Sequence, residues 1–240
     1  MQSTSTEMID GQVIWHDTQI LSKIDPLLFD LDWHRRQGEV LGGAPGRGRA
    51  HFLRIGGREL VLRPFRRGGL VGKINADLYL RLGATASRAF REYVLLGWMR
   101  DHNLPVPRPV AARYTPYAMY YRADLITERI PDARPLADIV LEEALTLETW
   151  TEIGAVIRQM HDLGVDHSDL NCRNILIDVN MQVWLIDFDK CRRRAAGGWR
   201  ARNLARLKRS LVKERTKHPS LFWSDADWAA VMAGYNACDL

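Results

Sequence analysis

The chain has 240 residues, of which 46% are hydrophobic and 26% charged, enough to bury one substantial core or two smaller ones. This composition excludes a disordered or fibrous protein. The formal net charge of +5 is concentrated in the segment 190–217, where twelve Lys and Arg residues face one acidic residue. The segment therefore carries +11 and the rest of the chain −6. Such a basic segment predicts an anionic partner.

The cysteines and the opening residues indicate in which cellular compartment the protein is expected. Cys172, Cys191 and Cys238 form no Cys-x-x-Cys pair and are odd in number, which argues against a disulfide framework or a zinc site. A reducing cytosol fits this pattern. The opening lacks a basic start followed by an apolar stretch, and no run approaches the ~20 apolar residues that cross a bilayer. Any membrane contact is therefore expected to be peripheral.

The first half of the chain predicts a small sheet with one helix. Residues 1–40 show no clear pattern, and we assign them no role. Four apolar segments of strand length follow, at residues 51–55, 59–63, 118–121 and 124–127. Gly56 and Gly57 are expected to form a hairpin turn between the first two. Ser87 is expected to cap a helix that continues to Met99 with Phe90, Val94 or Leu95, and Trp98 on its apolar face, before Pro105, Pro107 and Pro109 end helical structure.

The second half has a helical pattern around one hairpin. Apolar residues at steps of three and four predict a long helix over 145–163. Short strands are expected at 174–178 and 182–186, and a basic helix over 199–217 with Leu204, Leu207 and Leu211 as its apolar seam. We place a domain boundary near Pro131. The predicted parts are an N-terminal segment 1–40, a first lobe 41–130, and a second lobe 131–240 that contains the basic segment 190–217.

The strongest motif is His-Ser-Asp-Leu-Asn-Cys-Arg-Asn at 167–174, followed after an apolar strand pair by Asp-Phe-Asp at 187–189. It resembles the catalytic loop and the metal-binding motif of the protein-kinase-like superfamily. The resemblance implies an α+β, bilobal, protein-kinase-like fold. Its N-lobe would be an antiparallel sheet with one helix, and its C-lobe would be reduced and mainly helical.

Phosphoryl transfer from ATP explains the residue types in this motif. A carboxylate must position the acceptor hydroxyl and take its proton, and we assign that role to Asp169. Mg²⁺ prefers oxygen ligands close to the phosphates, which Asp187 and the amide oxygen of Asn174 would supply. A lone Asp or Asn beside a strand is usually a turn or cap residue, but three at matching spacing favour the site.

Three neighbours are further candidates. In the superfamily the equivalent of His167 is structural, so we expect His167 to support the loop rather than to exchange protons. Arg173 would reach the transferred phosphate, or is simply a solvated loop residue. Asp189 replaces the glycine of the usual Asp-Phe-Gly, and Ser168 replaces an arginine. Both departures are common in the small-molecule kinases of the superfamily. No Ala-Pro-Glu motif follows, so a protein substrate and loop phosphorylation are not expected.

The nucleotide-binding candidates are weaker. Gly46 and Gly48 lie in a glycine-rich stretch where the phosphate-covering loop belongs, although the spacing departs from Gly-x-Gly-x-x-Gly. Arg63 stands where the superfamily has a phosphate-binding lysine, and Glu92 is the candidate for its helix partner. Lys73 is the alternative phosphate-binding cation. Glu128 opens the segment expected to present backbone groups to adenine.

More of the chain resembles the lipopolysaccharide kinases. The residues that carry this likeness are LRPFRRGGL at 62–70, SRAFRE at 87–92, LPVPRP at 104–109, HSDLN at 167–171 and IDFDK at 186–190. The resemblance implies ATP-dependent phosphorylation of a 3-deoxy-D-manno-octulosonic acid (Kdo) hydroxyl, the 4-hydroxyl in the family. The acceptor would be Kdo-lipid A at the cytoplasmic face of the bacterial inner membrane.

The charge distribution fits such an acceptor independently. Kdo carries a carboxylate and lipid A carries phosphates, so a basic surface beside the site would favour both this substrate and an anionic membrane surface. A solvated basic helix is the plainer interpretation. Alternatives are a kinase of a core heptose or an aminoglycoside-type acceptor, and a catalytically inactive kinase fold used for binding, which Arg63 favours. No nucleic acid is expected as a partner, since no recognition motif is present, and the sequence leaves the oligomeric state open.

Overall fold

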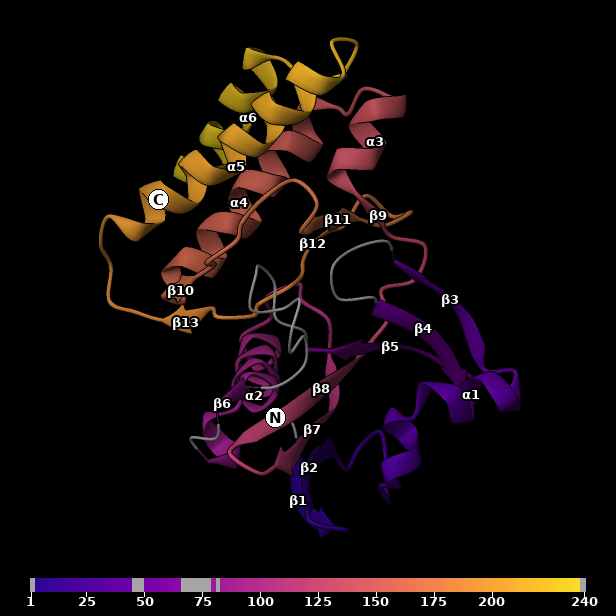
Figure 1. Ribbon diagram of the computed structural model, residues 1–240. Helices are drawn as coiled ribbons and strands as arrows, with labels where there is room; N and C mark the ends of the chain where they lie inside the picture. Colours follow the sequence, from indigo (N-terminus) through magenta and orange to yellow (C-terminus); the bar gives the residue numbers. More distant parts are fainter. Residues whose placement is uncertain (1–2, 45–49, 66–78, 81–82, 238–240) are drawn as a thin grey trace. The chain divides into compact units, whose positions relative to one another are not determined.

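The computed structural model describes residues 3–44, 50–65, 79–80 and 83–237 (Figure 1). Its contacts divide the chain into two units. Unit 1 comprises Met1–Asp101 and Pro107–Arg129, and unit 2 comprises His102–Val106 and Ile130–Leu240.

Unit 1 is built on an antiparallel sheet. Its strands are β1 (Thr4–Ile9), β2 (Gln12–Asp17), β3 (Val40–Ala44), β4 (Ala50–Ile55), β5 (Arg58–Pro64), β6 (Tyr79–Leu80), β7 (Pro109–Tyr117) and β8 (Tyr120–Glu128). They lie in the order β1-β2-β7-β8-β5-β4-β3, with β6 paired to β8. The predicted turn between β4 and β5 is confirmed, because Gly56 and Gly57 have φ angles of 55° and 77°. Such angles suit the tight hairpin turns that match strand twist.

The β7–β8 hairpin differs from the prediction. Residues 118–121 are not a separate strand: Ala118, with φ of 49°, and Met119 form the turn, and β8 begins at Tyr120. Strand β7 was not predicted: Pro109 was expected only to end helical structure. Pro109 is the first residue of β7, a position that needs no donor N–H in the ladder.

Residues that carried no sequence signal are part of unit 1. They form β1, β2, a 3-10 turn η1 (Pro26–Phe29) and a short helix α1 (Leu31–Gln37), so unit 1 holds more than the one helix expected. Ile14 and Phe29 join the apolar core of the sheet. The Trp15 ring on β2 packs 4.5 Å from that of Phe90.

Helix α2 (Arg88–Asp101) packs against β7 and β8. The predicted cap is confirmed, since Ser87 Oγ accepts the Phe90 N–H at 3.3 Å. Of the two alternatives predicted for one position of the apolar face, Leu95 is buried and Val94 is not. Val94 is 47% exposed, whereas Tyr93, Leu96 and Met99 are buried together with Glu92. A charged residue therefore lies on the buried face of α2.

Unit 2 is mainly helical. Its helices are α3 (Leu136–Glu142), α4 (Leu147–Asp162), α5 (Trp199–Lys217) and α6 (Asp225–Asn236), and its strands are β9 (Arg134–Pro135), β10 (Val165–Asp166), β11 (Ile175–Ile177), β12 (Val183–Leu185) and β13 (Arg192–Arg193). The predicted hairpin is confirmed as β11 and β12, with β9 on the other side of β11. The predicted helix α5 is confirmed, and its leucine seam is buried.

Helices α4 and α6 pack backbone to backbone. A Cβ on Gly154 would overlap the carbonyl oxygen of Val231, and a Cβ on Gly234 would overlap that of Thr151. Both glycines are therefore needed for this close approach. The pair supports α4, which ends just before the strand β10 that leads into residues 167–174.

Candidate catalytic site

The loop that follows β10 is fixed by a buried, neutral histidine. His167 Nδ1 lies 3.2 Å from the Asp169 N–H, which donates to it, so the proton belongs on Nε2, which donates to the Ile186 carbonyl at 3.1 Å. Burial lowers the pKa of His167, in keeping with this uncharged form. Both ring nitrogens are occupied, so the geometry gives His167 a supporting role, as the sequence led us to expect.

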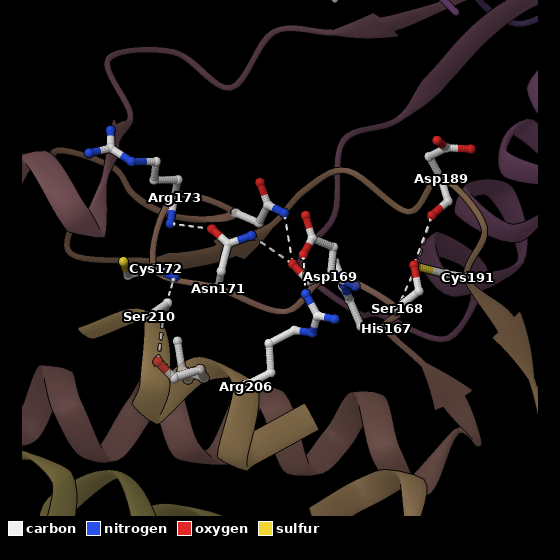
Figure 2. Close-up of polar contacts among 12 residues, drawn as sticks. His167, Ser168, Asp169, Asn171, Cys172, Arg173, Asp189, Cys191, Arg206 and Ser210 are labelled. Atoms are coloured by element: carbon white, nitrogen blue, oxygen red, sulfur yellow. Dashed lines mark hydrogen bonds and ion pairs between the residues drawn. The ribbon is translucent and has the colours of Figure 1, made fainter. Parts of the chain in front are cut away.

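Asp169 points into solvent from this loop. Its side chain is 53% exposed, and its Oδ1 accepts from Arg206 Nη1 of α5 at 2.7 Å (Figure 2). Its backbone carbonyl accepts from the amide nitrogens of Asn171 and Asn174 at 2.8 and 2.9 Å. Among the described residues, Oδ2 has no hydrogen-bond partner. One carboxylate oxygen is therefore held, and the other remains for an acceptor hydroxyl.

Asn174 and Asp187 are brought together by the β11–β12 hairpin. Ile175 pairs with Leu185, and the Ile186 N–H donates to the Asn174 carbonyl at 3.0 Å, so Asp187 follows directly beside Asn174. Because the amide nitrogen of Asn174 is bound to Asp169, its side-chain oxygen is the atom left to present. The backbones of Asn174 and Asp187 are thus neighbours, and both residues carry the oxygen ligands that Mg²⁺ prefers.

Asp187 has a backbone that few side chains adopt. Its φ is +63°, in the left-handed region. Asp and Asn tolerate this region better than other non-glycine residues, because their short polar side chains form local hydrogen bonds. Within the described residues, no three or more His, Cys, Asp or Glu side chains form a metal site. A magnesium site here would therefore depend on the phosphates for its remaining ligands.

The Asp-Phe-Asp segment is tied to the catalytic loop. Ser168 Oγ donates to the Asp189 carbonyl at 3.1 Å, and the Ser168 N–H donates to Cys191 Sγ at 3.3 Å (Figure 2). Phe188 is buried, as expected, with its ring centroid 4.8 Å from that of His167. Ser168, where many kinases have arginine, thus serves as a link between two parts of the site.

Arg173 has two carboxylate partners in unit 2. Its guanidinium donates to Asp138 on α3 and to Glu214 on α5, both at 3.3 Å. Glu214 is nearly buried. A hydrogen bond from Lys217 lowers its pKa, and the charge of Arg173 adds to this effect, while burial acts against it. These contacts give Arg173 a bridging role between the loop and two helices, beside the predicted role toward the transferred phosphate.

Asn203 on α5 is a site residue that the sequence did not reveal. Its Oδ1 accepts the His167 N–H at 3.0 Å and lies 3.2 Å from His161 Nε2, and its Nδ2 donates to Asp166 at 3.1 Å. Nδ1 of His161 lies 2.8 Å from the hydroxyl of Tyr235. Burial lowers the pKa of His161 to about 4. One buried amide therefore joins α4, α5 and the start of the catalytic loop.

Unit 1 contains the predicted pair of Arg63 and Glu92. The pair is confirmed: Arg63 near the end of β5 makes an ion pair with Glu92 on α2, and Glu92 is only 4% exposed. The Arg63 guanidinium also lies 5.0 Å from the centroid of the Phe65 ring. Phosphate binding by Arg63 stays a prediction. Gly46, Gly48 and Lys73 lie outside the described residues.

In the segment expected to contact adenine, which Glu128 opens, two backbone N–H groups are already bound within unit 1. The Glu128 N–H donates to the Arg108 carbonyl at 2.8 Å, and the Arg129 N–H donates to Glu59 at 2.9 Å. The Glu128 carboxylate accepts from Arg58 at 3.1 Å. An adenine contact from this segment would have to use other backbone groups.

Helix α5 sorts its cations onto two faces. Arg200, Lys208 and Arg215 lie 4.7–5.7 Å from the centroids of Trp199, Trp228 and Trp223. The others are exposed and form what we call the basic stripe: Arg202, Arg206, Arg209, Lys213 and Lys217. They are three or four residues apart, which places them along one side of a helix. None of the described helices is both long and apolar enough to cross a membrane.

Comparison with known proteins gives one family. The model of the lipopolysaccharide kinase (Kdo/WaaP) family matches residues 31–235. A 3-deoxy-D-manno-octulosonic acid kinase of Photobacterium profundum is 42% identical over 96% of this chain and 97% of its own length. Proteins with the same name from Vibrio cholerae and Haemophilus influenzae are 42% and 39% identical, over 89% and 87% of this chain and 90% and 89% of theirs.

Proposed function

Because the chain belongs to the lipopolysaccharide kinase (Kdo/WaaP) family, we propose that it transfers the γ-phosphoryl group of ATP to the 4-hydroxyl of Kdo on Kdo-lipid A. Membership makes the chain a kinase that acts on a hydroxyl group. The observation that carries the proposal is the loop of unit 2, where Asp169 is half exposed and His167 and Asn174 fix its backbone. This is the arrangement that a general base for an alcohol acceptor needs.

In the proposed reaction Asp169 positions the acceptor. Its Oδ2 accepts the hydrogen bond of the Kdo hydroxyl and takes the proton as the oxygen attacks the γ-phosphorus, and ADP leaves. His167 keeps the loop in place without changing its own charge, since both of its nitrogens are bound. The contribution of this base is typically 10²–10⁴-fold, so Asp169 should dominate turnover.

The residues beside Asp169 fit a magnesium ion. Asn174 and Asp187 would hold it through their side-chain oxygens, and the metal would neutralise the charge of the phosphates. Substitution Asp187→Asn keeps a residue that tolerates the left-handed backbone, so the variant tests the charge rather than the fold. We expect it to weaken Mg·ATP binding, measured by titration calorimetry, with the folded structure unchanged by circular dichroism.

Unit 1 would bind the nucleotide. Arg63 is held by Glu92 and would contact phosphate, in the role that lysine has in other kinases. Gly46 and Gly48 would cover the phosphates through their backbone N–H groups. The conservative substitution Arg63→Lys tests this assignment, because lysine restores the usual residue of the superfamily. ATP affinity should be retained in that variant and reduced in Arg63→Met.

We further propose that the protein works as a peripheral enzyme at the cytoplasmic face of the inner membrane. The basic stripe on α5 supports this, because each Lys or Arg near an anionic surface contributes about 1 kcal/mol. Sedimentation with vesicles of anionic and of neutral lipids at low and high salt tests it. Binding to anionic vesicles that salt reverses is expected. Absence of binding at both salt concentrations would contradict the proposal.

The activity is tested with labelled ATP, Mg²⁺ and three acceptors: Kdo-lipid A, lipid A without Kdo, and free sugars. Label is expected only on the Kdo-bearing lipid, and Asp169→Asn should transfer none above background. Mass spectrometry of the product locates the phosphate on the 4-hydroxyl or elsewhere. Transfer to a heptose or an aminoglycoside in place of Kdo would refute the acceptor, and ATP binding without transfer would favour a binding module.

A further inference from the structure

We infer that Arg206 recognises the carboxylate of the acceptor sugar while it holds Asp169, and so selects an acidic sugar as substrate. The inference rests on the proposed function, because it concerns the acceptor of the same reaction. Its basis is the contact between Arg206 Nη1 and Asp169 Oδ1, at 2.7 Å, which sequence analysis did not anticipate (Figure 2).

The guanidinium of Arg206 is used only in part. An arginine side chain has five N–H donors in a fixed plane, and Arg206 gives one of them to Asp169. Within the described residues, its other donors have no partner, and its side chain is 48% exposed. One edge of the guanidinium is therefore available to bind a second carboxylate through two parallel hydrogen bonds.

The backbone of α5 fixes Arg206 beside the catalytic loop. Leu204 and Leu207, on either side of it, are buried, and Asn203 is bound to the N–H of His167. Arg206 therefore cannot move away from Asp169 by a shift of the helix without breaking the support of the loop itself. A substrate group held by Arg206 lies next to the oxygen that takes the acceptor proton.

The ion pair between Arg206 and Asp169 is expected to contribute little to the stability of the fold. Exposed ion pairs contribute about 0–1 kcal/mol, and both partners here are about half exposed. The same helix binds three other cations to tryptophan rings, where their stems are partly covered. Arg206 is instead left open to solvent on the basic stripe and directed at the base. Recognition of an anion explains this placement better than packing does.

Kdo has the group that this guanidinium would recognise. Its carboxylate distinguishes it from neutral sugars such as heptose, and from aminoglycosides, whose amines a guanidinium would repel. Arg206 would thus position the acceptor and discriminate among sugars with one contact. Charge-assisted hydrogen bonds of this kind correspond to roughly 10- to 100-fold in kcat/KM.

The experiment pairs a change in the enzyme with a change in the acceptor. Wild-type protein, Arg206→Gln and Arg206→Lys are assayed in detergent micelles with Kdo-lipid A and with a derivative whose Kdo carboxylate is converted to the carboxamide. Arg35→Gln is the matched control, because Arg35 on α1 also donates from Nη1 to an exposed aspartate, Asp32, at 2.7 Å. We expect Arg35→Gln to behave like the wild type.

For Arg206→Gln we expect a loss of about 10- to 100-fold in kcat/KM on Kdo-lipid A, chiefly through KM, and less than threefold on the carboxamide. Arg206→Lys should recover part of the loss. Equal losses on both acceptors would overturn the inference and reduce Arg206 to a positioning residue for Asp169, and no loss on either would also overturn it. If the wild type phosphorylates neither acceptor, the proposed function fails and the inference with it.

Discussion

The two units each contain an arginine bound to a carboxylate, in opposite surroundings. In unit 1, Arg63 and Glu92 are 22% and 4% exposed. In unit 2, Arg206 and Asp169 are 48% and 53% exposed. Glu92 lies on the buried face of α2, where an unpaired charge would be costly, whereas the Asp169 side chain is in contact with water.

This difference separates a buried ion pair from an exposed one. Breaking a buried ion pair costs about 3–5 kcal/mol, because the remaining charge has no solvent, whereas an exposed pair contributes about 0–1 kcal/mol. Arg63 therefore has a fixed partner and a fixed position, which suits the proposed contact with the same nucleotide in every cycle. The side chains of Asp169 and Arg206, on backbone that is held in place, can change their contacts with solvent or a ligand at little cost.

The largest effect should come from Asp169. Asp169→Asn removes the proposed proton acceptor, and we expect kcat to fall about 1,000-fold, or about 4 kcal/mol, with the KM for ATP little changed. The free energy of unfolding should change by less than about 0.5 kcal/mol, because the side chain is half exposed. Steady-state kinetics and urea titration check the two values. A large loss of stability would mean that Asp169, like Glu92, contributes to the stability of the fold.

Next in size is the buried pair. Glu92→Gln leaves Arg63 without its counter-charge, so the free energy of unfolding should fall by about 3 kcal/mol, measured by urea denaturation. The double variant Arg63→Met/Glu92→Met removes both charges and should lose less than the single variant. If Glu92→Gln has the same free energy of unfolding as the wild type, burial does not make the Arg63–Glu92 pair more important for stability than the Arg206–Asp169 pair.

A third prediction concerns a buried group that stays neutral. His161 has a folded-state pKa of about 4, below its ordinary 6.5, because burial disfavours its charge. The unfolded chain therefore binds more protons, and stability falls as the pH falls. Between pH 7 and pH 5 the contribution of His161 should decrease by about 2 kcal/mol. The pH slope of the unfolding free energy should be shallower in His161→Gln, and equal slopes would contradict this assignment.

The smallest effect should be on the stability of Arg206→Gln. Because the pair with Asp169 is exposed, we expect the free energy of unfolding to stay within about 0.5 kcal/mol of the wild type. Differential scanning calorimetry at low and high salt checks this. A loss comparable to that of Glu92→Gln would mean that both pairs are structural.

The sequence predicted the parts that depend on local pattern. The resemblance to the lipopolysaccharide kinases, carried by residues 62–70, 87–92, 104–109, 167–171 and 186–190, is confirmed by the family match. The strand pair expected between the two motifs of unit 2 is confirmed as β11 and β12. The hairpin turn at Gly56 and Gly57, the cap at Ser87 and the basic helix α5 are confirmed as well, and each depends on residues close in sequence.

Long-range contacts escaped prediction. Arg206 and Asp169 are 37 residues apart, and nothing in the pattern of α5 distinguishes Arg206 from Arg202 or Arg209 before the helix is folded against the loop. In the sequence, Asn203 looks like any polar residue of a helix. Its three hydrogen bonds join it to His161 on α4, to the N–H of His167 and to Asp166. Strand β2 shows no alternation of exposed and buried residues, because it pairs with β7 and its Trp15 packs against Phe90 of α2.

The close packing of α4 and α6 sets the order in which unit 2 can be completed during synthesis. About sixty residues separate the end of α4 at Asp162 from the start of α6 at Asp225. At 5–20 residues per second the ribosome needs roughly 3–13 s to make them. Asp169, Asn174 and Asp187 are made within that interval, while the glycine face of α4 is still uncovered. A nascent chain therefore contains all three residues before α6 can pack against α4.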